Sequence, residues 1–197
     1  YEKTYELWDR AGIRVPPCFI VVCNNTSTSK LVYDFISGFL RENEDGSKTP
    51  IAGRFPLFRN FDEHGNPLPR PNTLLIDSEQ LEAGDALDDN FRGMAADEIE
   101  RFRREIVERT GDARSADSIT DQELLREVMN TVGKAGQLGG GIRCVVSVSM
   151  LTEGWDANTV THVLGIRAFG TQLLCEQVIG RALRRQSYDL NEEGLFN

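Results

Sequence analysis

The fold class of this chain is decided by the stretch from Cys18 to Ser27, which reads Cys-Phe-Ile-Val-Val-Cys-Asn-Asn-Thr-Ser. Its first six residues are apolar without alternation, as in a strand that is covered on both faces of a parallel sheet. The polar residues that follow are typical helix caps, and a helix-spaced apolar set comes next, namely Leu31, Phe35, Ile36 and Phe39. A strand, a polar loop and a helix begin a βα unit, which predicts an α/β fold.

Three further stretches predict buried strands at Thr73–Asp77, Ile142–Val148 and Val160–Ile166. Two helices are expected between the strand at Thr73–Asp77 and the strand at Ile142–Val148. One carries a helix-spaced apolar face and ends near Gly111, and the other begins at the capping box Thr120-Asp121-Gln122-Glu123. We therefore expect a three-layer domain with a mainly parallel sheet.

The remaining segments divide the chain into parts. Residues 1–17 predict a lead-in helix and linker, 18–190 the α/β domain, and 191–197 the start of a following segment. Within the domain, the polar residues 41–72 predict a surface hairpin, and 78–141 a helical insertion region. Because the chain starts at Tyr1, we expect a piece of a longer protein.

Some acidic and glycine-rich segments invite a catalytic interpretation that their context does not favour. Asp62-Glu63-His64 evokes the acidic box of an ATPase, but a turn-forming Gly-Asn-Pro follows it directly, and Asp97-Glu98 opens a helix. The acidic cluster from Asp77 to Asp89 does not match a calcium loop and fits a solvated surface or one facing a basic partner. Gly133–Gly141 lacks the Gly-Lys-Ser or Gly-Lys-Thr end of a phosphate-binding loop and predicts an ordinary loop.

Composition limits the function classes. The net charge is −9, from 31 acidic and 22 basic residues, so this chain is expected to hold nucleic acid only weakly by itself. The four cysteines lack Cys-x-x-Cys spacing, which favours buried free thiols in a reducing cytoplasm over a disulfide or metal site. With no signal-like start and no apolar run of roughly 18 residues, no membrane span is predicted.

The most informative helix is predicted at Thr171–Arg185. At about 100° per residue, Gln177, Arg181 and Arg184 share one side, whereas the apolar side carries Cys175, Val178, Ile179, Ala182 and Leu183. Two guanidinium groups one turn apart, with the small Gly180 beside them, suit a polyphosphate. A solvated cationic rim near a helix C-terminus is the plainer alternative.

Polar residues also follow two of the predicted strands. Thr152, Gly154 and Asp156 come after the strand at Ile142–Val148, and Asn24–Thr26 come after Cys23. Ligands of parallel α/β sheets bind beyond the carboxyl ends of the strands, so these residues could contact a ribose or a phosphate. Simple helix capping is the alternative for Asn24–Thr26.

These segments together resemble motifs of a known family. Thr152-Glu153-Gly154-Trp155-Asp156 and the stretch Glu176–Arg185 resemble motifs V and VI of superfamily 2 helicases, and Ile20–Thr26 resembles motif IV. The residues of these motifs are most similar to those of the helicase (Res) subunit of type III restriction enzymes and of DEAD/DEAH-box proteins. The resemblance covers roughly two thirds of the chain, and Asn43–Arg70 and the acidic segment fall outside it.

The resemblance implies a second RecA-like domain of an ATP-driven DNA translocase or helicase, part of an ATP hydrolase in a restriction-modification system. It implies that Arg184 is an arginine finger and Arg181 its companion, with Gln177 ordering the nucleotide site. Gly154 and Asp156 would approach the ribose. Thr152, Asn24 and Thr26 would touch the nucleic-acid backbone.

The same resemblance implies partners that this chain does not supply. ATP with Mg²⁺ would be held mainly by a preceding first RecA-like domain, since no Walker A loop occurs here, and the chain alone is expected to be inactive. Double-stranded DNA and a methyltransferase or specificity subunit are the other implied partners. The alternative is a non-catalytic RecA-like module whose arginine face binds a nucleotide or a protein.

Overall fold

The structure is a computed structural model that describes residues 1–76, 96–112, 114, 119–148, 157, 159–166, 176 and 180. Its centre is a sheet of four parallel strands in the order β4-β5-β1-β6. The strands are β1 (Cys18–Cys23), β4 (Thr73–Ile76), β5 (Cys144–Ser147) and β6 (Val160–Ile166). All four lie within the predicted stretches, so the prediction of an α/β fold with a parallel sheet is confirmed.

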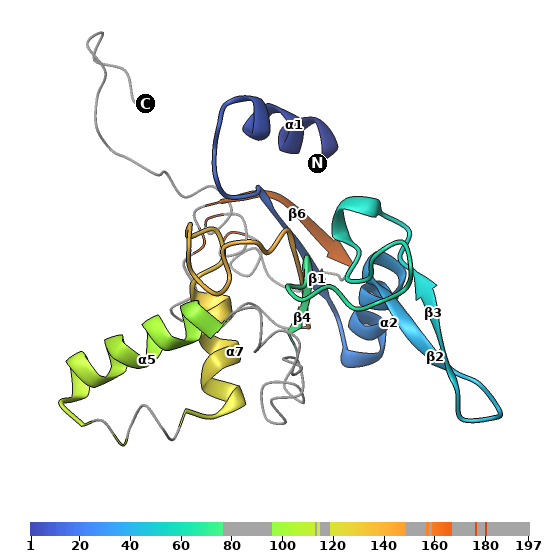
Figure 1. Ribbon diagram of the computed structural model, residues 1–197. Coiled ribbons are helices and arrows are strands. Elements are labelled where there is room, and N and C mark those ends of the chain that lie inside the picture. The colour runs from blue at the N-terminus through green and yellow to red at the C-terminus, as the bar shows by residue number, and fades with distance from the viewer. Residues whose placement is uncertain are drawn as a thin grey trace, which may run out of the picture.

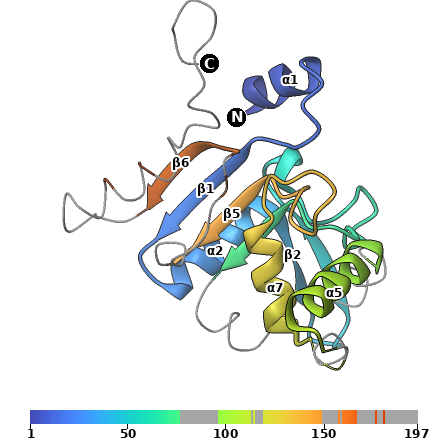
Figure 2. The ribbon, with the colours of Figure 1, turned by 90° about the vertical axis from the view of Figure 1, so that its left-hand side faces the viewer.

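Helices cover both faces of this sheet (Figures 1 and 2). On one face, α5 (Ala96–Thr110) and α7 (Asp121–Asn130) contribute to an apolar cluster that includes Ile20, Leu125 and Val145. On the other face lie α2 (Thr26–Ser37) and the short 3-10 helix η1 (Pro56–Phe58), in a second cluster with Val21 and Val146. The unalternating strand sequences follow from this coverage, since successive side chains enter opposite clusters.

Two crossovers whose helices lie among the described residues run in opposite directions on opposite faces. From β1 the chain passes α2 and enters β4, two strands away, and from β4 it returns past α5 and α7 to the adjacent β5. Reversing both the direction and the face keeps the same hand for both connections, as expected for parallel βαβ units.

The inserted hairpin differs from the prediction in its position. β2 (Gly38–Glu42) starts at the C-terminus of α2 and pairs antiparallel with β3 (Lys48–Ala52), so the hairpin turns at 43–47. The turn around Asp62 closes only an isolated bridge between Phe61 and Pro67. Gly38 has φ +89°, and a side chain there would meet the carbonyl oxygen of Ile51, so glycine allows the helix to run directly into the strand.

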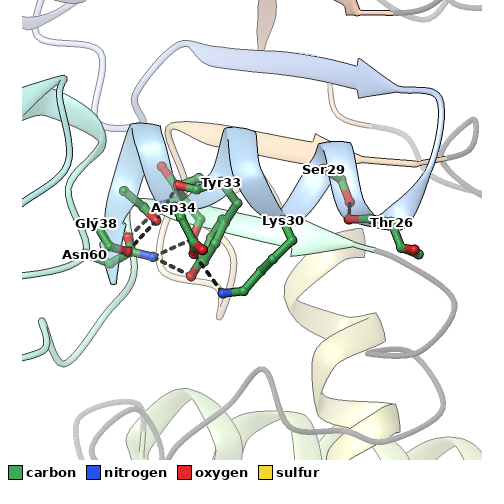
Figure 3. A network of polar contacts seen from close by, with 9 residues as sticks. Thr26, Ser29, Lys30, Tyr33, Asp34, Gly38 and Asn60 are labelled. Atoms are coloured by element: carbon green, nitrogen blue, oxygen red, sulfur yellow. Dashed lines mark hydrogen bonds and ion pairs between the residues drawn. The ribbon is translucent and has the colours of Figure 1, made fainter. Parts of the chain in front are cut away.

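A buried asparagine fixes the insertion to the sheet (Figure 3). The side-chain nitrogen of Asn60 donates to the Tyr33 hydroxyl (2.9 Å) and to the Thr73 carbonyl (2.8 Å). Its oxygen accepts from the backbone N–H groups of Asn72 and Thr73, both at 2.9 Å. One side chain therefore joins α2, the segment after η1 and the start of β4.

The first helix, α1 (Glu2–Arg10), has no fully buried residue and contacts the domain through aromatic side chains. Tyr1 is the N-cap residue of α1, and its hydroxyl donates to the Pro17 carbonyl at 2.7 Å. The Arg143 guanidinium lies 5.0 Å from the centre of the Tyr5 ring. The prediction of a helix near the start of the chain is confirmed over these residues. No helix among the described residues is long and apolar enough to cross a membrane.

The capping box of α7 gives a first stability prediction. The Thr120 hydroxyl accepts from the Glu123 N–H, and the Glu123 carboxylate accepts from the Thr120 N–H at 2.8 Å, which lowers the pKa of Glu123. We expect Thr120→Ala to cost about 1 kcal/mol in urea unfolding, whereas Thr120→Ser keeps the cap.

The cost should also depend on pH. The pKa of Glu123 is lower in the folded protein than in the unfolded chain, so its ionised carboxylate stabilises the fold above the unfolded-state pKa. This stabilisation is lost as the pH falls through the folded-state pKa. Thr120→Ala keeps the backbone N–H donor but removes the Thr120 hydroxyl, which also donates to this carboxylate at 3.0 Å. The difference between wild type and Thr120→Ala should therefore shrink in acid, and a difference that stays constant from pH 7 to pH 3 would contradict this account of the cap.

Candidate functional site

The carboxyl ends of the three neighbouring strands β5, β1 and β6 lie side by side at one edge of the sheet. Cys23 of β1 pairs in register with Ile166 of β6, and Val22 pairs with Ser147 of β5. Because the strands are parallel, the segments that follow β5, β1 and β6 all leave from this edge. These are the three segments that carry the residues singled out in the sequence.

The loop after β1 is described in full and leads directly into α2. Asn25 is the N-cap, and its side-chain oxygen accepts from the Thr28 N–H at 2.8 Å. Asn24 is exposed, Thr26 is half-buried, and the Thr26 carbonyl accepts from the Ser29 hydroxyl (Figure 3). Capping is therefore the role of Asn25, and it leaves the amide of Asn24 at the surface beside the first turn of α2.

Most of the predicted site residues lie outside the described residues: Thr152, Gly154, Asp156, Gln177, Arg181 and Arg184. Two residues of the predicted helix at 171–185 are described. Glu176 and Gly180 are both helical and exposed, and a side chain at Gly180 would meet nothing within 4 Å. The open space beside Gly180 agrees with the expectation from the sequence.

The connection from β5 to β6 is anchored at its far end. Ala157 and Val160 belong to the apolar cluster beneath α5 and α7, and Thr159 is buried. A side chain at Gly133, where φ is +77°, would collide with Thr159, so glycine is needed for this close approach. The connection thus starts at the carboxyl edge of the sheet and ends at the opposite edge, on the α7 face.

The structure also contains a hollow that the sequence did not indicate. It has a volume of about 380 Å³ and lies on the α2 face, toward the amino ends of β1 and β6. Its walls come from four separate segments and include Tyr1, Phe19, Phe55, Phe58 and His162. Partial burial lowers the pKa of His162. Only the fold brings these aromatic residues together.

Three described cysteines and the Asp62 carboxylate have structural roles. Cys18, Cys23 and Cys144 are buried free thiols, as expected, and burial raises the pKa of Cys18 to about 12. They are therefore not nucleophiles at neutral pH. Asp62 accepts from the N–H groups of His64 and Asn66, both at 2.8 Å, which agrees with the predicted turn. No cluster of three or more potential metal ligands occurs in the described part of the chain.

Comparisons with protein-family models, with curated proteins and with solved structures found no match to this chain.

Proposed function

We propose that this chain is the second motor domain of an ATP-dependent DNA translocase or helicase of a type III restriction-modification system, with a RecA-like fold. The main support is the adjacency of β5, β1 and β6, whose carboxyl ends lead into the motif-like segments at one edge. In α/β sheets of this kind that edge is where nucleotides and phosphates are bound.

In this proposal the arginine segment completes a nucleotide site whose remaining parts belong to a preceding domain. That domain would hold ATP and Mg²⁺. The guanidinium groups of Arg184 and Arg181 would stabilise the charge that develops on the transferred phosphoryl group, and the Gln177 amide would help to order them. Gly154 would allow close approach of the ribose, and the Asp156 carboxylate would accept from its hydroxyl groups.

The DNA track would use the loop after β1 and the segment after β5. The exposed Asn24 amide, together with Thr26 and Thr152, has uncharged hydrogen-bonding groups suited to the sugar-phosphate backbone. Such contacts position DNA without reading its sequence. A net charge of −9 fits this limited share of the contact, with the cations supplied by the partner domain.

The decisive experiment joins the chain to its native upstream segment and measures ATP hydrolysis with and without duplex DNA. A motor domain gives hydrolysis that DNA stimulates. A longer chain that binds ATP but never turns it over, with or without DNA, would instead support a non-catalytic nucleotide- or protein-binding module.

The DNA contact can be tested separately in the same longer chain. Asn24→Ala removes one exposed hydrogen-bonding group, so we expect duplex affinity to fall about fivefold, equally for unrelated sequences. Asn130→Ala, at an exposed position at the end of α7, is the matched control and should bind as wild type does. Equal affinities of wild type and Asn24→Ala in a titration at fixed salt would remove Asn24 from the proposed track.

A further inference from the structure

Part of the α2 face of the sheet is left open on its β6 side. Along β6, Val163 packs against the α5 and α7 cluster, whereas the His162 ring contacts Phe19 of the opposite cluster. Side chains alternate along a strand, so Leu164 and Ile166 point to the α2 face together with His162. They are 46% and 38% exposed, although both are large and apolar.

The open area continues across aromatic rings to α2. Phe35 of α2 is 57% exposed and meets the Phe55 ring edge-on, at 5.9 Å between centres. Phe55 then contacts Phe58, which contacts Phe19. We call the exposed members of this series, Phe35, Phe55, Leu164 and Ile166, the apolar strip. It borders the aromatic hollow that Phe55 and His162 line.

We infer that the apolar strip is the docking surface for the helix predicted at Thr171–Arg185, through Cys175, Val178, Ile179, Ala182 and Leu183. This inference goes beyond the proposed function, because it holds for a motor domain and for a binding module alike. It assigns the apolar side of that helix to a defined place in the fold.

Chain length and direction favour this occupant. β6 ends at Ile166, and residues 167–170 are a link long enough to reverse direction. A helix of 15 residues is about 22 Å long, close to the length of a seven-residue strand at about 3.3 Å per residue. A helix that returns along β6 therefore passes over Ile166 and Leu164 and ends near the aromatic hollow. The other face is already covered by α5 and α7.

One of the two described residues of the segment supports this orientation. On a helical wheel, Gly180 lies about 130° from the middle of the apolar side and is exposed. Glu176, also exposed, lies at the border of that side, about 20° from Leu183. With the apolar side on the strip, Gln177, Arg181 and Arg184 face outward, free to meet a bound phosphate or a partner domain.

Cross-linking in the complete chain tests the docking. The three described cysteines are fully buried, so a bismaleimide will report on Cys175 and on an introduced cysteine. Leu31→Cys should give an intramolecular link to Cys175 with a reagent that spans about 10 Å, a usual distance between packed helix axes. Leu31 is exposed one turn before Phe35, in the half of α2 nearer the carboxyl ends of the strands, where the docked helix would begin. Lys30→Cys is the control, since Lys30 pairs with Asp34 on the other flank of α2 and should give no link.

Each other outcome contradicts the docking. A link from Lys30→Cys as frequent as that from Leu31→Cys would show a segment with no fixed position, and links between two molecules would show a second copy on the strip. A second measurement needs no substitution: Cys175 should react with a thiol reagent about tenfold more slowly in the folded chain than in urea, because the docked helix must open first. Reaction at the same rate in both would also overturn the inference.

Discussion

Replacement of Arg184 by alanine is expected to reduce DNA-stimulated ATP hydrolysis at least about 10³-fold in the chain that includes its native upstream segment, which is the lower range for loss of an arginine finger. The guanidinium matters most in the transition state, where charge builds up on the transferred phosphoryl group. The loss should therefore appear in kcat, with a much smaller change in the KM for ATP.

Arg185→Ala is the matched control for this experiment. It removes the same charge from the neighbouring residue, which lies outside the Gln177, Arg181 and Arg184 set, so hydrolysis should stay within about threefold of wild type. The unfolding midpoints of both variants in urea should match that of wild type, which would exclude a folding defect. Equal hydrolysis in Arg184→Ala and wild type would refute the arginine-finger role while leaving the docking of the helix on the apolar strip untouched.

The fold was predictable because its strands are short, apolar and separated by caps. Cys18–Cys23 and Thr73–Ile76 are covered on both faces, so their sequences carry no alternation, and this pattern predicts a parallel sheet. The strand order β4-β5-β1-β6 was not predictable, because pairing depends on crossovers that periodicity does not encode.

Local patterns failed where glycine and long-range contacts decide the structure. The hairpin was expected to start at residue 41 and to turn near Asp62, but Gly38 allows β2 to begin directly after α2. The aromatic hollow combines residues as distant as Tyr1 and His162, which no local window contains. For the site, the sequence supplied the motif-like segments, and the sheet register supplied the common edge of the strands that precede them.

The largest stability effect should come from Asn60→Asp, an almost isosteric change at the buried junction of α2 and β4. Asp keeps an oxygen to accept from the N–H groups of Asn72 and Thr73 but replaces the donor to the Thr73 carbonyl with a second oxygen. A buried carboxylate facing a carbonyl is repelled and poorly solvated, so we expect a loss of about 3–4 kcal/mol at pH 7 in urea unfolding. Asn24→Asp, at an exposed position before α2, should change stability by less than about 0.5 kcal/mol.

The pH dependence of Asn60→Asp distinguishes this cause from a general packing defect. Burial favours the neutral acid, so the folded pKa of the new carboxyl lies above its unfolded value of about 3.9. A group whose pKa is higher in the folded protein contributes its full stability below its unfolded-state pKa, and this stability is lost as the pH rises through the folded-state pKa. The variant should therefore recover much of its lost stability between pH 7 and pH 4, because the protonated acid can donate to the Thr73 carbonyl or to the Tyr33 hydroxyl as the amide does. A loss independent of pH would show that the junction tolerates the charge and that the hydrogen bonds of Asn60 do not hold α2 on the sheet.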